Sequence, residues 1–303
     1  MPIAESPQKD VKKKLTRCVR ILEEKYGPHI YPEDVQNPLE QIVFAILAAR
    51  NPVTNARKAV RDFKDDYVDW NEVRVGTIRQ LEDTLEKARI EPTARYAELI
   101  KQLLEKTFNE VCRVSLDTLR VDGPEKARKT VSKLDCLEPH EQQYLLVGAG
   151  VEEAPPLDPA TDRICARIGL FGADEAPQKR RRLLEQHVAA QDALRFHHLM
   201  VEHGKKLCTE EAPKCAKCPV QAECDYFRAL EARKKSDEKD RSKGAAPAKK
   251  AAPPEKKPAA AKAELKKSAK PAAASGASKA KVAAKAAKKP PKPAKRGRAD
   301  EDE

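Results

Sequence analysis

The stretch Cys208-Thr-Glu-Glu-Ala-Pro-Lys-Cys215-Ala-Lys-Cys218-Pro-Val-Gln-Ala-Glu-Cys224 places four cysteines within 17 residues, separated by six, two and five residues. A segment this short cannot bury a hydrophobic core of its own, and small units of this size depend on disulfides or metals for their structure. The other four cysteines of the chain are scattered along it. The four clustered thiols are therefore the feature around which the fold is organised.

Three kinds of site can use four thiols at this spacing. Disulfides belong to secreted proteins, and the N-terminus MPIAESPQKDVKKK lacks the apolar segment of a signal peptide. Zinc sites usually combine two separate C-x2-C pairs, whereas this stretch has one. A cuboidal [4Fe–4S] cluster has four iron corners, which suits one short loop with uneven spacings. The pattern favours such a cluster, with zinc and disulfides as alternatives, and the ligands would be Cys208, Cys215, Cys218 and Cys224.

The cysteine spacing resembles the iron–sulfur loop of the endonuclease III family of DNA glycosylases, in the helix-hairpin-helix superfamily. The preceding residues, Phe196-His-His-Leu-Met-Val-Glu-His-Gly-Lys-Lys-Leu-Cys208, are also similar, because that family leads into its first cluster cysteine with a helix, His-Gly and basic residues. The resemblance covers most of residues 10–228. It implies two helical lobes and a cluster loop at 208–224 that presents basic residues to the DNA backbone, here Lys205, Lys206, Lys214 and Lys217.

Helical patterns run through the first 228 residues. Apolar residues at 10–26 share one helix face, and Asn37-Pro38 supplies an N-cap and a first-turn proline for a buried helix over 39–49. Residues 76–107 read as two helices with a break at Ile90-Glu91-Pro92, and another helix follows at 126–134. No stretch alternates like a strand with turn signals beside it. We therefore expect an all-α domain over residues 1–228.

The positive charge lies at the C-terminal end. Residues 241–303 hold 19 Lys and Arg and 6 Asp and Glu, which is a net charge of +13. The net charge of the whole chain is +12, so the other 240 residues have a net charge of −1. From Ala229 onwards, Lys, Ala and Pro dominate, and such a composition cannot bury enough surface to fold. We expect residues 229–303 to be a disordered basic tail. Nucleic acid is its favoured partner because neutralised phosphates release counterions, and a solubilising tail without a specific partner is the alternative.

The resemblance also implies a catalytic carboxylate, which the family places in a Val-Asp-Thr-His-like stretch before a helix with Arg, Arg and Gly. Here Leu157-Asp158-Pro-Ala-Thr-Asp-Arg163-Ile-Cys-Ala-Arg167-Ile-Gly169 has the same frame, except that Pro-Ala replaces Thr-His. Asp158 is thus the candidate catalytic residue, and Asp162, one helical turn later, is the competing one. An aspartate before proline at a helix start is also expected as an N-cap alone.

The hairpin departs from the family, which has Leu-Pro-Gly-Val-Gly-Arg-Lys-Thr-Ala. The aligned stretch is Leu137-Glu-Pro-His-Glu-Gln-Gln143-Tyr-Leu145, without the glycines that let backbone N–H groups approach a phosphate. Gln143 stands in place of the lysine that forms a Schiff base with the sugar, and an amide cannot form an imine. Arg50 takes the place of the residue that fills the gap left by a flipped base. A surface residue at a helix end is the alternative for Arg50.

These features together predict a base-excision repair glycosylase that removes damaged bases and lacks lyase activity. The alternative is a catalytically inactive DNA-binding protein that retains the scaffold. The expected partner is double-stranded DNA with damaged bases or abasic sites, contacted by Arg50, Gln143, Lys205, Lys206 and Lys217. No apolar run reaches the 18 residues needed to span a bilayer. We expect a monomer in the cytoplasm, associated with the nucleoid if the source is bacterial.

Overall fold

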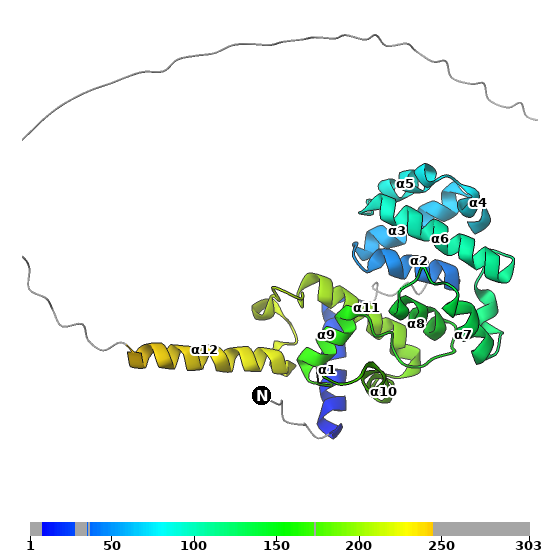
Figure 1. Ribbon diagram of the computed structural model, residues 1–303. Helices are drawn as coiled ribbons and strands as arrows, with labels where there is room; N and C mark the ends of the chain where they lie inside the picture. Colours follow the sequence, from blue (N-terminus) through cyan, green and yellow to red (C-terminus); the bar gives the residue numbers. More distant parts are fainter. Residues whose placement is uncertain (1–7, 28–34, 36, 173, 245–303) are drawn as a thin grey trace, which may run out of the picture. The chain divides into compact units, whose positions relative to one another are not determined.

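The computed structural model describes residues 8–27, 35, 37–172 and 174–244. Its regular elements within these ranges are all helices, which confirms the predicted all-α class (Figure 1). The α-helices are α1 (Gln8–Tyr26), α2 (Pro38–Ala48), α3 (Val53–Asp66), α4 (Trp70–Val75), α5 (Ile78–Lys87), α6 (Thr93–Val111), α7 (Pro124–Ser132), α8 (Pro139–Gly148), α9 (Pro159–Ile168), α10 (Pro177–His187), α11 (Ala193–Lys206) and α12 (Asp225–Gly244). Short 3-10 helices lie at Asp117–Arg120, Ala190–Asp192, Cys215–Lys217 and Gln221–Glu223.

The predicted helix boundaries follow from local capping. The Asn37 side chain accepts hydrogen bonds from the backbone N–H groups of Leu39 and Glu40, so it starts α2 as expected. Most of α2 is fully buried, which confirms its place in the centre of a core. The predicted break between two helices falls between α5 and α6, where the Asn51 side chain accepts a hydrogen bond from Glu91 N at 2.9 Å.

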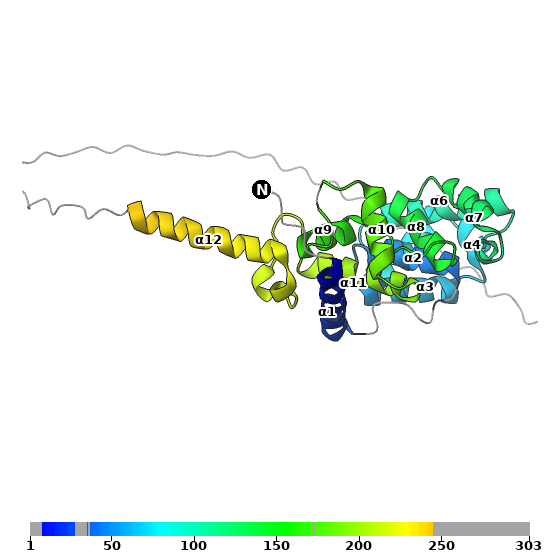
Figure 2. The ribbon, with the colours of Figure 1, turned by 90° about the horizontal axis from the view of Figure 1, so that it is seen from below.

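Two hydrophobic cores divide the helices into two lobes. The large lobe contains α2–α8, and the cysteine lobe contains α1, α9, α10, most of α11 and the loop with the four cysteines. Helix α11 serves both cores, because Ala193 and Leu194 belong to the first and Phe196 and Leu199 to the second. Figures 1 and 2 show α1 and α9 beside α11, away from α4 and α5. This arrangement confirms the two lobes that the resemblance implied.

Helix α12 continues through Gly244 and extends away from the other helices in both ribbon views (Figures 1 and 2). The expectation of disorder is therefore wrong for residues 229–244. This segment contains Ala, Glu, Lys and Arg, which favour helix, and no proline. An ion pair between Lys234 and Glu231 at 3.0 Å adds i,i+3 support. The rest of the predicted tail, 245–303, lies outside the described residues.

Within the described ranges, no helix combines the length and the apolar character that crossing a bilayer would require.

Candidate functional site

Asp158 is the N-cap of α9. Its two carboxylate oxygens accept hydrogen bonds from Thr161 N and Ala160 N, each at 3.0 Å, so the capping role expected from the sequence is confirmed. The residue is only 6% exposed. The partial positive charge at the start of a helix favours a negative charge at this place. The fold therefore holds a buried carboxylate in a fixed orientation.

Asp158 lines a small pocket where the two lobes meet. Helix α2 contributes an apolar wall, α8 contributes an imidazole, a carboxyl group and a phenol, and α11 contributes a second imidazole. The other residues that line the pocket are Ile42, Ala45, Ala49, His140, Glu141, Tyr144, His197 and Val201. Groups that can exchange protons thus lie around the carboxylate that the sequence predicts as catalytic.

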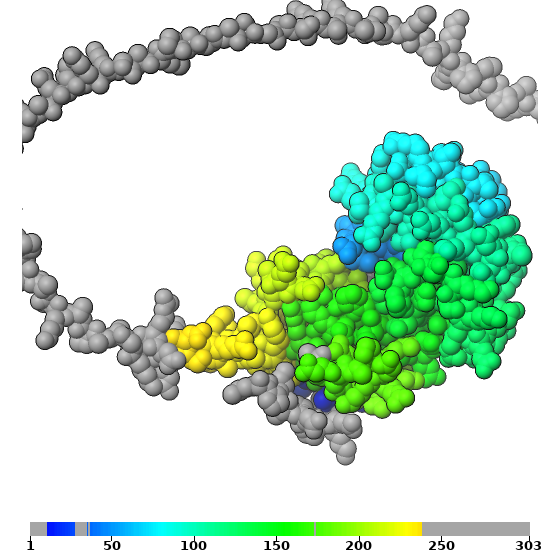
Figure 3. Space-filling view, viewed as in Figure 1, coloured from blue at the N-terminus to red at the C-terminus, as the bar shows by residue number. Residues whose placement is uncertain are grey.

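The surface view shows where α2 reaches the outside of the molecule. Part of the blue α2–α3 segment is visible between the cyan helices and the yellow-green cysteine loop (Figure 3).

His197, which lines the pocket, and its neighbour His198 are both buried. His197 Nδ1 lies 3.6 Å from Asp158 Oδ1, and Tyr144 Oη lies 3.0 Å from His198 Nε2. Burial lowers the pKa of His197, and the nearby Asp158 carboxylate acts in the opposite direction. Burial likewise lowers the pKa of His198. The sequence alone does not predict this group, although the His-His doublet lies in the stretch that resembles the family.

Gln143 holds the loop that carries Asp158. Its side-chain oxygen accepts a hydrogen bond from Leu157 N at 3.1 Å, so it ties α8 to the residue next to the carboxylate. This gives the amide a structural role at the position aligned with the family's lysine. Contact between Gln143 and DNA stays a prediction.

In the hairpin between α7 and α8, acidic side chains bond the backbone N–H groups at the start of α8. Glu138 and Glu141 form a capping box at the start of α8, in which Glu141 accepts a hydrogen bond from Glu138 N at 2.8 Å. Burial raises the pKa of Glu141. A backbone N–H that could face a phosphate is thus already bonded to a carboxyl group. Lys133, the nearest preceding lysine, forms an ion pair with Glu110 instead of facing the pocket.

The end of α2 is held by a lysine from α11. Lys205 Nζ donates to the carbonyl oxygens of Ala48 and Asn51 at 2.7 and 2.8 Å, and it also pairs with Glu202. Its ammonium therefore fixes the turn that carries Arg50, which is itself exposed. Lys206 pairs with Glu202 too and remains 59% exposed in its side chain. Lys214 and Lys217 are exposed. DNA contact by these basic residues stays a prediction, and Lys205 has a second, structural use.

The four clustered cysteines line one cavity together with α9 and α11. Cys224 is buried and the other three are half-buried. The scattered cysteines lie elsewhere: Cys18 and Cys165 are buried in the core of the cysteine lobe, and Cys112 is exposed. In the ranges listed above for the structure, no three His, Cys, Asp or Glu side chains converge on a single metal ion.

The Arg-Arg-Gly frame after Asp158 anchors the cysteine loop. Arg167 donates to Cys208 Sγ at 3.2 Å and to the carbonyl oxygen of Thr209 at 2.7 Å, and Arg163 donates to the carbonyl oxygen of Cys208 at 3.1 Å. Gly204 allows α11 to approach α9, because a Cβ there would lie 2.7 Å from the Cβ of Ala160. The residues that follow Asp158 therefore connect it rigidly to the cysteines.

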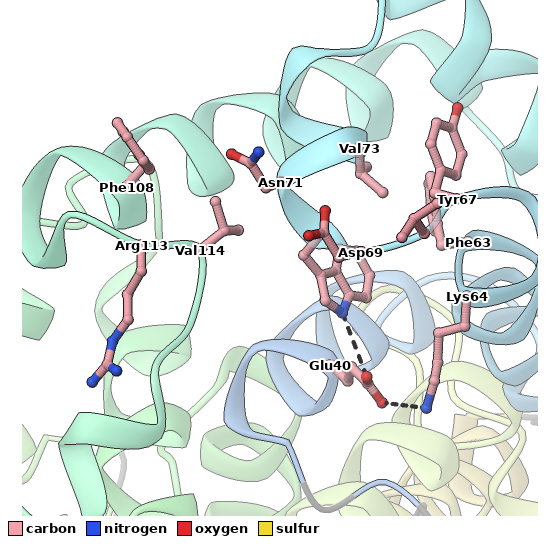
Figure 4. Close-up of a pocket in the computed structure, with 12 residues that line it drawn as sticks. Glu40, Phe63, Lys64, Tyr67, Asp69, Asn71, Val73, Phe108, Arg113 and Val114 are labelled. Atoms are coloured by element: carbon pink, nitrogen blue, oxygen red, sulfur yellow. Dashed lines mark hydrogen bonds and ion pairs between the residues drawn. The ribbon is translucent and has the colours of Figure 1, made fainter. Parts of the chain in front are cut away.

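A wider hollow on the large lobe does not include any predicted site residue. Phe63, Tyr67 and Trp70 form part of its wall, and Glu40 lies at its base (Figure 4). The Glu40 carboxylate accepts hydrogen bonds from Trp70 Nε1 at 3.4 Å and from Lys64 Nζ at 3.2 Å. The hollow contains none of the residues that the resemblance places in the active site, so the pocket at Asp158 is the stronger candidate for chemistry.

No family model matches the chain. Among curated proteins, DNA glycosylase/AP lyase ROS1 of Arabidopsis thaliana is 24% identical over 179 residues, which are 54% of this chain and 13% of that protein. Protein ROS1A of Oryza sativa subsp. japonica is 24% identical over 179 residues, 54% of this chain and 9% of that protein. Endonuclease III of Sulfolobus acidocaldarius is 29% identical over 72 residues, 24% of this chain and 32% of the enzyme. The chain thus matches a small part of each relative's length.

Solved structures show the same fold. A non-covalent endonuclease III–DNA complex aligns with a TM-score of 0.53 and 16% identity over 73% of this chain and 98% of that one. A thermostable thymine-DNA glycosylase aligns with a TM-score of 0.55 and 16% identity over 74% of this chain and all of that one (100%). The chain therefore has the fold of endonuclease III and of the thymine-DNA glycosylase, and part of its sequence is similar to DNA glycosylase/AP lyase ROS1 and to endonuclease III.

Proposed function

We propose that this protein is a DNA glycosylase that removes damaged bases from duplex DNA in base excision repair. The observation that carries the proposal is the buried Asp158 carboxylate, fixed at the start of α9 and facing a pocket with His140, Tyr144 and His197. The activities named for its relatives, DNA glycosylase/AP lyase and endonuclease III, support the same reaction class.

The chemistry follows from the charge of Asp158. Enzymes that act on a base within a duplex extrude the nucleotide into a pocket. When the bond between the base and the sugar C1′ breaks, positive charge develops on the sugar, and a fixed carboxylate stabilises that charge. Gln143 and the backbone of α9 keep the carboxylate in place, so little reorganisation is needed during the reaction. A base-release assay on duplexes that each contain one damaged base tests the proposal.

We expect base release without strand cleavage, because Gln143 cannot form the Schiff base that cleavage by a lyase requires. Borohydride added to protein on abasic duplexes should trap no covalent adduct above the level of a boiled-protein control. The matched variant Gln143→Lys tests the position, since it restores an amine there. A strong adduct with the wild-type protein, mapped to any lysine, would show that another residue is the nucleophile.

We propose further that the four clustered cysteines hold one [4Fe–4S] cluster. A cuboidal cluster binds each cysteine through a different iron atom, so the sulfurs surround a cavity and do not need to converge on one ion. The four thiols line one cavity, and the Arg167 guanidinium donates a hydrogen bond to Cys208 Sγ at 3.2 Å, so this sulfur is held in place beside α9. When bound, the cluster would supply structure by fastening the cysteine loop to α9 and α11.

Protein purified without oxygen should be brown and contain about four iron and four sulfide per chain. Cys215→Ser should lose the cluster and much of the soluble protein, because a loop of this length has no core of its own. Cys112→Ser is the control, since Cys112 is exposed in the large lobe and should leave iron content unchanged. Stoichiometric zinc without acid-labile sulfide would contradict the proposal.

The hairpin between α7 and α8 favours a second candidate, a DNA-binding protein without catalysis. Glu138 and Glu141 lie in the stretch that aligns with the family's glycine-containing hairpin, and their carboxyl groups accept hydrogen bonds from backbone N–H groups there. Such a protein would bind damaged and intact duplexes but release no base from any duplex of the panel. The base-release assay therefore separates the two candidates directly.

A further inference from the structure

We propose that His197 is a positioning residue for Asp158, and that the two side chains together hold the proton released during hydrolysis. The inference rests on the proposed glycosylase function. Nδ1 of the buried His197 ring has no hydrogen-bond partner and faces Oδ1 of the buried Asp158 carboxylate at 3.6 Å.

The orientation of the imidazole fixes its protonation. His197 forms a hydrogen bond with the backbone of Pro156, and proline offers only a carbonyl acceptor. Nδ1 has no partner, so Nε2 donates to that carbonyl. A neutral imidazole has one N–H and one lone pair. Nδ1 of the neutral ring therefore presents a lone pair to Asp158 Oδ1.

Two acceptors facing each other leave a place for one proton. Asp158 uses both oxygens to accept backbone N–H groups of α9, and each oxygen still has a free lone pair. A proton on Nδ1 would be donated to Oδ1, which would satisfy both groups at once. Burial of the ring favours the neutral form and the carboxylate favours the protonated one. The pair can therefore take up a proton and release it again.

The surroundings limit where else that proton can go. Helix α8 presents His140, Glu141 and Tyr144 to the same pocket, and α2 presents only apolar side chains to it. Next to His197 on α11, His198 has its Nε2 within 3.0 Å of Tyr144 Oη. His140 and Glu141 are thus the titratable groups that could compete with His197 for the proton. Neither forms an ion pair with Asp158, whereas His197 Nδ1 lies 3.6 Å from Asp158 Oδ1.

This pair would supply the general base that activates water, which the reaction needs because Gln143 offers no amine nucleophile. The C1′–N bond breaks and its electrons leave with the base, while the oxygen of a water molecule bonds to C1′. The water's proton passes to Asp158 and then to Nδ1 of His197, and the departing base takes a proton from solvent. Asp158 stays anionic beside an imidazolium, which afterwards returns its proton to solvent.

His197→Gln tests this role with little change in packing, because the glutamine amide can still donate to the Pro156 carbonyl but has no group at the Nδ1 position. Single-turnover base release should fall by about 10², while duplex affinity and Tm stay near wild type. The wild-type rate should fall as pH drops below the ordinary histidine value of 6.5, because a protonated His197 accepts nothing. That acid limb should be absent from the variant. His187→Gln, on α10 and outside the pocket, is the control and should keep both rate and limb.

A second measurement does not depend on activity. The titration of His197 is followed by NMR of its ring Cε1–H in the full chain, with His197→Gln for assignment. Asp158→Asn should lower the pKa of His197, because it removes the charge that favours the imidazolium. An unchanged pKa, or an acid limb that survives in His197→Gln, would overturn the pair. If the pKa shift occurs but no duplex loses a base, the proton pair stands and the glycosylase proposal fails.

Discussion

Asp158→Asn should reduce single-turnover base release by about 10³, since it removes the charge that stabilises the developing sugar cation. Asparagine is as good an N-cap as aspartate, so α9 should keep its start and its contacts with the cysteine loop. Affinity for duplex DNA and Tm should therefore remain close to wild type. The measurement is base release under single-turnover conditions, beside a binding titration on the same duplexes.

Asp162→Asn is the matched control, one helical turn away on the same helix. The Asp162 carboxylate lies 2.6 and 2.7 Å from Arg180 Nη1, so it links α9 to α10 and does not line the pocket. This variant should lower stability and keep base release. Loss of activity in Asp162→Asn with full activity in Asp158→Asn would move the catalytic carboxylate to the residue that the sequence left as its competitor.

Removal of residues 245–303 should weaken binding to undamaged duplex by one or more orders of magnitude at low salt. These residues hold 17 Lys and Arg and 6 Asp and Glu. Lysines bind duplex DNA through counterion release, which gives a slope of log K against log [salt] of roughly −0.9 per phosphate neutralised. Truncation after Gly244 should flatten that slope and leave Tm unchanged, because it keeps α1–α12 complete.

The decisive readout is a salt titration on intact and abasic duplexes. A tail of equal length with its lysines changed to glutamine should behave like the truncated chain, which separates charge from length. Preference for the abasic duplex should survive in both, since the pocket at Asp158 lies in the helical lobes. If truncation leaves the salt slope unchanged, the segment does not bind DNA, and an acidic protein partner becomes the better explanation.

The helix boundaries are predictable from the sequence where a single residue caps or breaks a helix. Asn37 caps α2, the break at Glu91-Pro92 separates α5 from α6, and Asp158 caps α9, each by backbone rules that act over a few residues. The sequence does not predict that α12 extends to Gly244, because the change in composition at Ala229 indicates a disordered tail from that residue onwards. Charged residues with high helix propensity continue the helix well beyond that point.

The site was predictable only in part. The sequence gives Asp158 and the four cysteines through local patterns, but the partners of Asp158 come from α8 and α11. Tyr144 and His198 are 54 residues apart in the sequence, and no local pattern around either residue predicts that they are in contact. Lys205 shows the opposite limit: it lies beside the cysteine loop, but its ammonium bonds the carbonyl oxygen of Ala48 at the end of α2, 157 residues earlier in the chain.

Helix α1 has a consequence for the order in which the protein assembles during synthesis. Its partners lie at the other end of the helical part: Tyr26 bonds to His203 and Arg17 to Glu223, across 177 and 206 residues. The large lobe is continuous in sequence from α2 to α8 and lacks only Ala193 and Leu194 of α11, so most of it can form while the chain is still growing. The apolar face of α1 stays partly uncovered until α11 has emerged. The four cysteines emerge after α1, α9, α10 and α11, so the cysteine lobe closes after the large lobe, around the earliest of its own helices.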